Sequence, residues 1–384
     1  MSVTAAQGFL AAGIAAGIKA NGNPDLALVV NSGPRLAAAG VFTSNRVKAA
    51  PVVWSEQVVK GGRVSAVILN SGGANACTGP LGFQDTHATA EKVADVLDGH
   101  SAGEVAVAST GLIGVRLPMD KLLPGVEKAA AELTGHGGEK AAIAIKTTDS
   151  VHKTAQVAKD GWTVGGMAKG AGMLAPGLAT MLAVLTTDAD VPAEQLDAAL
   201  RAATRTTFDR VDSDGCTSTN DTVLLLASGA SGVVPEAAAF VEAVREVCGD
   251  LARQLIGDAE GASKDIRIDV INAATEDEAV EVGRSIARNN LLKCALHGED
   301  PNWGRVLSAI GTTSATFDPD RLNVAINDVW VCKNGSVGED RELVDMRYRE
   351  VRITADLAAG TESAVIWSND LTADYVHENS AYSS

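Results

Sequence analysis

The sequence predicts a mixed fold of α-helices and β-strands, because two kinds of hydrophobic pattern alternate along its 384 residues. Short aliphatic runs bounded by glycine, asparagine or aspartate indicate strands, and longer amphipathic runs that begin near proline or end near glycine indicate helices. Hydrophobic residues make up 46% of the chain, which is enough to build a large core. A chain of this length is also expected to form two domains, or one large domain with an addition.

Several strands in the first part of the chain are apolar on both faces, so we expect them to be covered on both sides. The strands predicted there span residues 26–30, 64–70, 105–109, 163–168, 181–187 and 222–227. Helices are predicted over residues 86–97, 194–204, 236–256 and 276–289.

After about residue 265 the predicted strands show clearer alternation of apolar and polar residues. They span residues 266–270, 324–331, 351–355 and 363–367. This change predicts a boundary near residue 280, with a catalytic core over 1–280 and a smaller C-terminal α/β region over 281–384. Taken alone, the polar residues 377–384 are typical of a frayed tail.

The composition excludes several classes of function. Asp and Glu number 48 against 32 Lys and Arg, so the net charge is −16, which disfavours nucleic acids and anionic membranes as partners. The five cysteines are widely spaced without a CxxC pair, so neither a disulfide framework nor a zinc site is expected. No apolar run is long enough to span a membrane and no signal peptide is evident, so we expect a cytoplasmic protein.

The common motifs for nucleotides, metals and serine nucleophiles are also missing from the sequence. It lacks the dinucleotide fingerprint GxGxxG in its required context, a P-loop, an HExxH pair and a GxSxG elbow. We therefore expect neither a metal nor another cofactor.

Residues 165–190 form the most unusual stretch, in which a glycine-rich turn leads to Thr180 at the mouth of an apolar strand. On composition alone, Thr180 is an ordinary threonine that opens a strand. A second interpretation is chemical: if the chain breaks before Thr180, the new α-amine becomes a general base beside the threonine hydroxyl. Its ordinary pKa near 8 leaves much of that amine neutral at working pH.

The stretch KGAGMLAPGLATMLAVLTTDA, which begins at Lys169, strongly resembles the self-cleavage and nucleophile segment of the ornithine acetyltransferase (glutamate N-acetyltransferase) family of arginine biosynthesis. The resemblance covers the whole chain and is to the self-cleaving, bifunctional type. Further blocks that resemble the family are GFLAAGIAAGIK, FTSNRVKAAPV, ILNSGGANACTG, ASTGLIG, TTDS, STNDTV, GDAEGASK, HGEDPNWGR and the C-terminal ENSAYSS.

The resemblance implies a role for each residue that matches the family pattern. Cleavage is expected between Ala179 and Thr180, giving an α chain of residues 1–179 and a β chain of residues 180–384. Thr180 is then the nucleophile that accepts the acetyl group, and Thr110 and Gly111 stabilise the oxyanion. The substrate contacts implied are Thr147, Lys169, Thr180, Glu260, Asn379 and Ser384.

The chemistry of these residues suits the substrates. Lys169 can pair with the α-carboxylate that acetylornithine and glutamate share, and Glu260 can pair with the side-chain ammonium of ornithine. Thr147 is chosen over the adjacent Thr148 from its spacing to Lys169, although both fit the pattern. His297 is assigned no catalytic role, because the α-amine already supplies a base.

The resemblance implies an αββα sandwich similar to that of N-terminal-nucleophile hydrolases, with a smaller C-terminal α/β region. It implies ping-pong transfer of an acetyl group from N-acetylornithine to glutamate, without a cofactor, by an α2β2 heterotetramer. Some relatives also use acetyl-CoA, and the sequence does not decide that point. Two alternatives remain: a self-cleaving aminopeptidase or amidohydrolase of similar architecture, and a non-catalytic protein that binds amino acids.

Overall fold

The computed structural model describes residues 2–174 and 181–381, which divide into two compact units. The first unit comprises the residues up to Asp209 and Cys216–Asp258, and the second comprises Arg210–Gly215 and the residues from Ala259 onward. The division therefore lies at Asp258, whereas the sequence pattern suggested residue 280. The difference arises because residues 265–273 form a strand inside the sheet of the second unit, and the following helix packs on that sheet.

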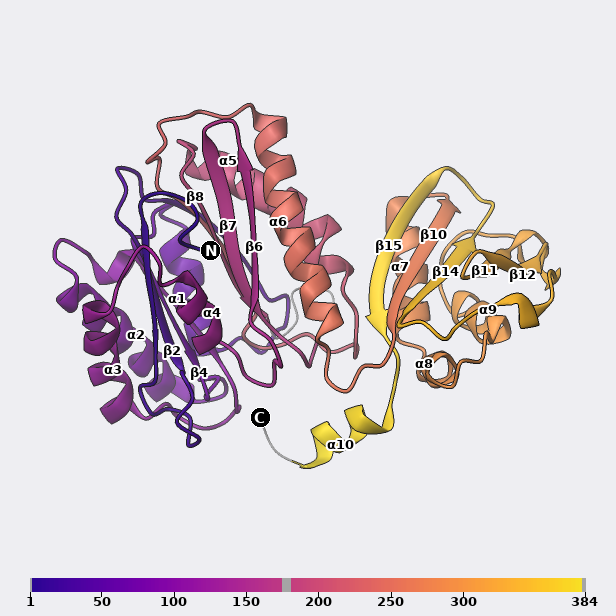
Figure 1. Cartoon of the computed structure of the whole chain (residues 1–384), viewed down its shortest axis with the longest axis horizontal. Coiled ribbons are helices and arrows are strands. Elements are labelled where there is room, and N and C mark those ends of the chain that lie inside the picture. The colour runs from indigo at the N-terminus through magenta and orange to yellow at the C-terminus, as the bar shows by residue number, and fades with distance from the viewer. Residues whose placement is uncertain (1, 175–180, 382–384) are drawn as a thin grey trace. The chain divides into compact units, whose positions relative to one another are not determined.

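The first unit contains two β-sheets (Figure 1). One has the strand order β1-β2-β4-β5 and the other the order β3-β9-β8-β7-β6. The first sheet is built from β1 (Phe9–Ile14), β2 (Leu26–Asn31), β4 (Ala66–Ser71) and β5 (Val105–Thr110). The second is built from β3 (Ala37–Phe42), β6 (Lys153–Lys159), β7 (Trp162–Lys169), β8 (Leu182–Thr187) and β9 (Thr222–Ala227).

The two sheets pack face to face and helices cover their outer faces. Leu69 of one sheet and Val184 and Leu224 of the other belong to the same buried core. The helices of this unit are α1 (Ala50–Val59), α2 (Gly79–Val96), α3 (Met119–Ala131), α4 (Gly138–Ala144), α5 (Ala193–Thr206) and α6 (Ala237–Gly257).

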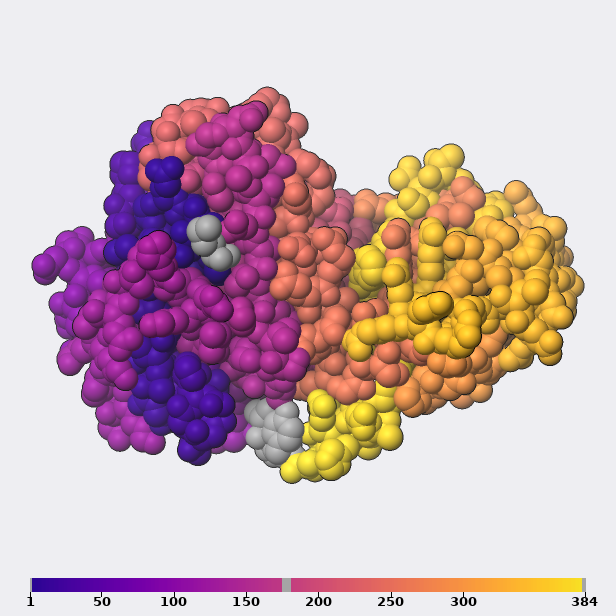
Figure 2. Space-filling model, in the orientation of Figure 1, coloured from indigo at the N-terminus to yellow at the C-terminus, as the bar shows by residue number. Residues whose placement is uncertain are grey.

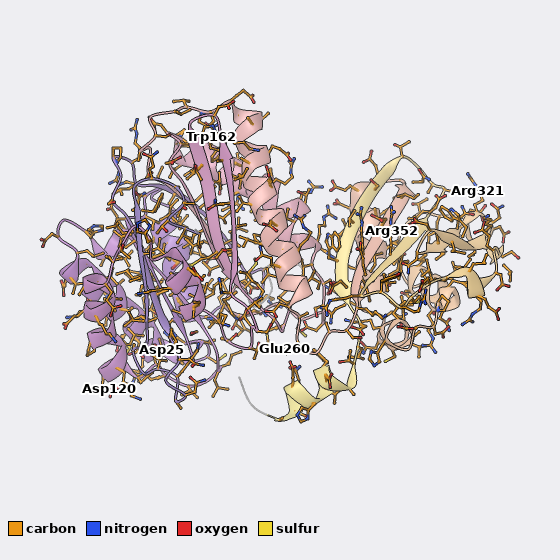
Figure 3. All side chains as sticks on the ribbon, viewed as in Figure 1. Asp25, Asp120, Trp162, Glu260, Arg321 and Arg352 are labelled. Carbon is orange, nitrogen blue, oxygen red and sulfur yellow. The ribbon has the colours of Figure 1, made fainter. Side chains whose placement is uncertain are left out.

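Each outer face has its own pair of helices. Helices α2 and α3 share a second apolar core with the four-stranded sheet, while α5 and α6 pack on the five-stranded sheet. On that side the ring of Trp162, labelled in Figure 3, lies 5.7 Å from the ring of Phe240 in α6. The layers are therefore helix, sheet, sheet and helix, which confirms the predicted αββα sandwich.

The second unit is a separate α/β layer built on a six-stranded sheet of order β13-β12-β11-β14-β10-β15. Strand β10 runs parallel to β14 and antiparallel to β15. The strands are β10 (Asp265–Ala273), β11 (Asn323–Ile326), β12 (Val329–Lys333), β13 (Ser336–Val337), β14 (Glu350–Asp356) and β15 (Glu362–Asn369). The helices are α7 (Glu276–Ala287), α8 (Asn290–His297), α9 (Trp303–Ile310) and α10 (Ala373–Ala381).

One predicted strand of this unit is two strands. The sequence pattern predicted a single strand over 324–331, but β11 and β12 form a hairpin that turns at Asn327 and Asp328. Both turn residues have positive φ angles, of 46° and 67°. Two consecutive positive φ angles are the hallmark of a tight hairpin turn, for which asparagine and aspartate are favoured.

Residues 377–381, which the polar composition predicted as part of a frayed tail, belong to helix α10 instead. None of its residues is buried, and Figure 2 shows it in yellow on the molecular surface. The turn before it is nevertheless fixed, since the hydroxyl of Thr372 donates a hydrogen bond of 2.6 Å to the carbonyl of Gly261. Among the helices described, none is both long and apolar enough to cross a membrane.

A close backbone contact at β1 gives a test of the packing. The segment before α4 pairs with Ala11 of β1, and a Cβ atom on Gly137 would lie 1.7 Å from the carbonyl oxygen of Ala11. We expect G137A to lower the free energy of unfolding by about 1–3 kcal/mol, because backbone atoms must move apart. Urea unfolding followed by circular dichroism measures this change.

Gly135 is the matched control for Gly137. It lies two residues away, and a Cβ atom there would meet nothing within 4 Å. We expect G135A to change the free energy of unfolding by less than about 0.5 kcal/mol. Equal effects of G135A and G137A would contradict the close packing described here.

Candidate functional site

Two of the predicted site residues meet in the first unit. Lys169 is the last residue of β7 and Thr110 the last residue of β5, so they come from different sheets. The side-chain nitrogen Nζ of Lys169 lies 3.3 Å from Oγ1 of Thr110. Both residues are only 1% exposed, so the contact is shielded from water.

The direction of this hydrogen bond has a chemical consequence. A lysine ammonium has donors and no acceptor, so Oγ1 of Thr110 must accept. The hydroxyl hydrogen of Thr110 then remains available for donation to another group. A hydroxyl donor beside a buried cation is suited to stabilising a negatively charged oxygen.

The backbone after Thr110 is fixed by glycines. Gly111 has a φ of 131°, and a Cβ atom there would lie 2.5 Å from the amide nitrogen of Gly73. The carbonyl of Thr110 accepts hydrogen bonds from the amides of Gly72 and Gly73, at 2.9 and 3.0 Å. Position 111 therefore requires glycine for both its conformation and its close approach.

Asp149 ties the predicted residue Thr147 to the loop that follows Lys169. Its Oδ2 accepts a hydrogen bond of 3.0 Å from the amide of Thr147. Its Oδ1 accepts one of 2.6 Å from the amide of Gly170 and one of 2.7 Å from Nζ of Lys153. The structure thus brings Thr110, Lys169 and Thr147 into one hydrogen-bonded neighbourhood, together with Asp149, which sequence reasoning did not single out.

This neighbourhood is a buried network of charges. Lys153 is fully buried and also contacts Oδ2 of Asp258, at 2.6 Å. Burial by itself would raise the pKa of Asp149, but the cations of Lys169 and Lys153 and hydrogen bonds from Lys153 and Gly170 lower that pKa to about 2. Asp149 is therefore ionised throughout the physiological range.

A further cation, Lys19, lies at the end of the first family-like block. Its Nζ donates to the carbonyl oxygens of Lys146 and Pro24, at 2.7 and 3.1 Å. The buried carboxylate of Asp25, labelled in Figure 3, accepts a hydrogen bond of 2.8 Å from the backbone amide of Lys19. Burial lowers the pKa of Lys19, and the positive charge of Lys169 acts in the same direction.

Two other predicted residues meet in the second unit. Nδ2 of Asn379, in α10, donates a hydrogen bond of 2.9 Å to Oε2 of Glu260. The backbone beside Glu260 packs tightly, since a Cβ atom on Gly261 would lie 2.2 Å from the amide nitrogen of Tyr375. Figure 3 labels Glu260, which is partly buried.

His297 is engaged in structural contacts of the second unit. Its Nδ1 lies 3.0 Å from Oδ2 of Asp370 and 3.1 Å from the hydroxyl of Ser263. The same aspartate accepts the backbone amides of Ser263 and Lys264, at 2.9 Å each. These bonds tie His297, which is the last residue of α8, to Asp370 and to the loop around Ser263.

Three predicted residues, Ala179, Thr180 and Ser384, lie outside the described residues. The residue that follows Thr180, Met181, is described, and its backbone amide donates a hydrogen bond of 3.0 Å to Oδ1 of Asp221. Asp221 belongs to the family-like block STNDTV. That block was the feature of the sequence that could have identified Asp221, but sequence reasoning assigned the residue no role.

The chemistry of the converging side chains can be compared with that of metal and anion sites. Across residues 2–174 and 181–381, no cluster of three or more His, Cys, Asp or Glu residues has a geometry that could hold a metal ion. The groups that do converge are the ammoniums of Lys169 and Lys153, the hydroxyl of Thr110 and the ionised carboxylate of Asp149. The ammonium and the hydroxyl are of the kinds that bind carboxylates and stabilise negative charge.

The low pKa of Asp149 makes stability depend on pH in a defined window. Because the folded pKa of about 2 lies below the ordinary value of 3.8, the ionised group stabilises the fold above about pH 4. This contribution, about 2 kcal/mol, is lost as the pH falls toward 2. The difference in unfolding free energy between the wild type and D149N should therefore shrink over that window, as measured by urea unfolding.

Asp120 supplies the control for this experiment. It is an exposed residue in the first turn of α3 and is labelled in Figure 3. We expect D120N to change the free energy of unfolding by less than about 0.5 kcal/mol at neutral pH. A difference for D149N that does not shrink between pH 4 and pH 2 would contradict the charge network.

The chain matches known proteins over its full length. The ArgJ family matches residues 10–384. The arginine biosynthesis bifunctional protein ArgJ of Streptomyces avermitilis is 83% identical over 384 residues, covering all of both chains. The protein of the same name from Mycobacterium tuberculosis is 59% identical over 391 residues, covering 100% of this chain and 96% of that protein.

Among solved structures, ornithine acetyltransferase from Mycobacterium tuberculosis, complexed with ornithine, is 66% identical in the aligned part. That match covers 46% of this chain and 94% of the other, with a TM-score of 0.45. The family match and the full-length identities show the family membership that the motifs indicated. The chain belongs to the ArgJ family of bifunctional arginine-biosynthesis enzymes.

Proposed function

We propose that this chain transfers an acetyl group from N2-acetyl-L-ornithine to L-glutamate, with Thr180 as the nucleophile. Membership of the family supports the reaction, and one observation of the structure supports the site: Nζ of Lys169 and Oγ1 of Thr110 meet at 3.3 Å in a buried place. A cation and a free hydroxyl hydrogen are thereby held together, as acyl transfer requires for its oxyanion.

The first half-reaction begins with the hydroxyl of Thr180. Its oxygen attacks the acetyl carbonyl of N-acetylornithine, while its proton passes to the α-amine of the same residue. The tetrahedral oxyanion is stabilised by donors from Thr110 and Gly111. The bond between the acetyl carbon and the ornithine nitrogen then breaks, the proton goes to that nitrogen, and ornithine leaves an acetyl ester on Thr180.

The second half-reaction reverses these steps with glutamate. The glutamate amine attacks the ester carbonyl and gives a proton to the α-amine of Thr180. The bond to the Thr180 oxygen then breaks, that oxygen takes the proton back, and N-acetylglutamate leaves. Acetyl-CoA is proposed as a second possible acetyl donor only on the ground that some relatives use it.

The substrate contacts follow from charge. Lys169 is proposed to bind the α-carboxylate that both substrates carry, with Thr147 beside it. Glu260, whose carboxylate already accepts the amide of Asn379, is proposed to bind the side-chain ammonium of ornithine. Ser384 is proposed as a substrate contact from the resemblance alone.

Self-cleavage between Ala179 and Thr180 is part of the proposal, because the α-amine that acts as the base exists only after that bond breaks. The products are the α chain, residues 1–179, and the β chain, residues 180–384. From the resemblance we further propose that two copies of each assemble as an α2β2 heterotetramer in the cytoplasm.

Mass spectrometry of the denatured protein tests the nucleophile, the cleavage site and the order of events together. With N-acetylornithine and no acceptor, the β chain should gain the mass of one acetyl group, and glutamate should then remove it. T180A should remain one uncleaved chain that never becomes acetylated.

Other outcomes would assign a different function. Hydrolysis of N-acetylornithine at the same rate with and without glutamate would favour the aminopeptidase or amidohydrolase alternative. An intact chain that binds ornithine saturably without turnover would favour an amino-acid-binding protein.

Replacing Thr110 with valine tests the oxyanion role. T110V keeps the shape of the side chain and removes its hydroxyl, so we expect kcat to fall about 100- to 1,000-fold with little change in KM. Steady-state kinetics with both substrates measures the effect.

Thr89 is a suitable control for Thr110. It is a buried threonine whose hydroxyl donates a hydrogen bond of 2.7 Å to the carbonyl of Asp85 within α2. T89V should keep a kcat close to that of the wild type. A kcat for T110V equal to that of T89V would remove Thr110 from the mechanism.

A further inference from the structure

Two adjacent polar residues, Asn220 and Asp221, lie buried immediately before β9. Asn220 is 3% exposed and Asp221 is fully buried. Their side chains make hydrogen bonds to segments far away in sequence, and the proposed mechanism does not use either of them. Burying two polar side chains costs free energy unless hydrogen bonds within the protein replace those to water. Such hydrogen bonds also fix the positions of the groups that they join.

Asn220 holds the end of the strand that carries Thr110. Its Nδ2 donates hydrogen bonds to the carbonyl oxygens of Ser109 and Ala74, at 2.8 and 2.6 Å. Its Oδ1 accepts the hydroxyl of Thr219 at 2.6 Å, so this orientation of the amide satisfies both ends of the side chain. Ser109 directly precedes Thr110, and Ala74 follows the glycines that bind the carbonyl of Thr110.

Asp221 holds the strand that follows Thr180. Its Oδ1 accepts the backbone amide of Met181, which is covalently joined to Thr180, at 3.0 Å. Strand pairing reinforces this contact, since the amide of Thr222 donates a hydrogen bond of 3.1 Å to the carbonyl of Met181. Asp221 is thus attached next to the proposed nucleophile.

Asp221 is fully buried, and the backbone amide and hydroxyl of Ser218 also act on its carboxyl group. Burial raises the pKa of Asp221 well above its usual value, although the amide of Met181 and the charge of Lys169 act against this shift.

We propose that Asn220 and Asp221 are positioning residues that fix the distance between the oxyanion donors and the nucleophile. Asn220 anchors the backbone at Ser109 and Thr110, and Asp221 anchors the backbone at Met181. Because neighbouring Cα atoms are a fixed distance of about 3.8 Å apart, one dipeptide sets the spacing of two segments that come from different sheets. The inference rests on the proposed roles of Thr110 and Thr180.

Isosteric exchanges at the two positions are expected to have opposite effects on the rate. D221N keeps a carbonyl acceptor for the amide of Met181, whereas D221A removes it. N220D replaces the one amide nitrogen that donates to the carbonyls of Ser109 and Ala74 by a carboxyl oxygen, so it should separate the two segments. A misplacement of about 1 Å between reacting groups lowers a rate about 100-fold.

The experiment measures two rates in each variant: self-cleavage, followed by gel electrophoresis, and acetylation of the β chain by N-acetylornithine, followed by intact mass. We expect N220D and D221A to be about 100-fold slower in acetylation, with little change in the KM for N-acetylornithine. D221N should recover most of the rate lost in D221A. If N220D fails to fold, N220A, which removes the donors without adding a charge, takes its place.

A control variant separates positioning from loss of stability. Thr186 lies in β8, is fully buried and donates its hydroxyl to the carbonyl of Val3 at 2.8 Å. T186V removes one buried hydrogen bond from the strand that follows the nucleophile, far from its first residue. It should lower the thermal midpoint and leave both rates close to those of the wild type.

Three results would overturn this inference without touching the proposed function. In the first, N220D and D221A are acetylated as fast as T186V; in the second, their rates fall only in proportion to the loss of folded protein. In the third, D221N is as slow as D221A. The last result would mean that the carboxyl group takes part chemically. A wild-type protein that is never acetylated would instead overturn the proposed function, and this inference with it.

Discussion

The burial of one ammonium group, that of Lys169, is the constraint on which the rest of the site depends. A charged amine at 1% exposure loses most of its hydration, which costs several kcal/mol unless opposite charge and hydrogen bonds replace it. Asp149 supplies the opposite charge, and it also binds the amides of Thr147 and Gly170. The carboxylate that balances the charge of Lys169 therefore also holds the neighbouring loops in place. This explains why residues from several strands and loops converge there.

Small residues let this convergence happen. The first unit places a strand end, a turn and two sheets within contact of one another, and Gly111 and Gly73 meet where no side chain would fit. The chain has 39 glycines and only 4% aromatic residues, a composition that suits close backbone contact more than large interlocking side chains. Around this site, hydrogen bonds and ion pairs fix the positions of the segments, and large interlocking side chains do not.

Backbone packing also brings together two predicted residues of the second unit. Glu260 and Asn379 meet because the turn at Gly261 packs directly against the start of α10, and Thr372 fastens it. Helix α10 has no buried side chain, so local hydrophobic pattern gave little reason to expect an ordered segment there. The order comes from hydrogen bonds to residues more than a hundred positions earlier in the chain.

The sequence by itself determined the fold class, most strands and the long helices, because alternating or helical hydrophobic patterns are local properties of the chain. Its motifs also identified the family, and they singled out Thr110, Lys169 and Glu260 as residues to which we assign proposed roles. It did not reveal the hairpin at Asn327, although Asn327 and Asp328 interrupt the apolar run with residues that favour a tight turn. Only the tertiary structure revealed the contacts of Asp149, Asn220 and Asp221. Their partners lie up to 146 residues away, as for Asn220 and Ala74, and a hydrogen bond across that distance leaves no periodic trace in the sequence.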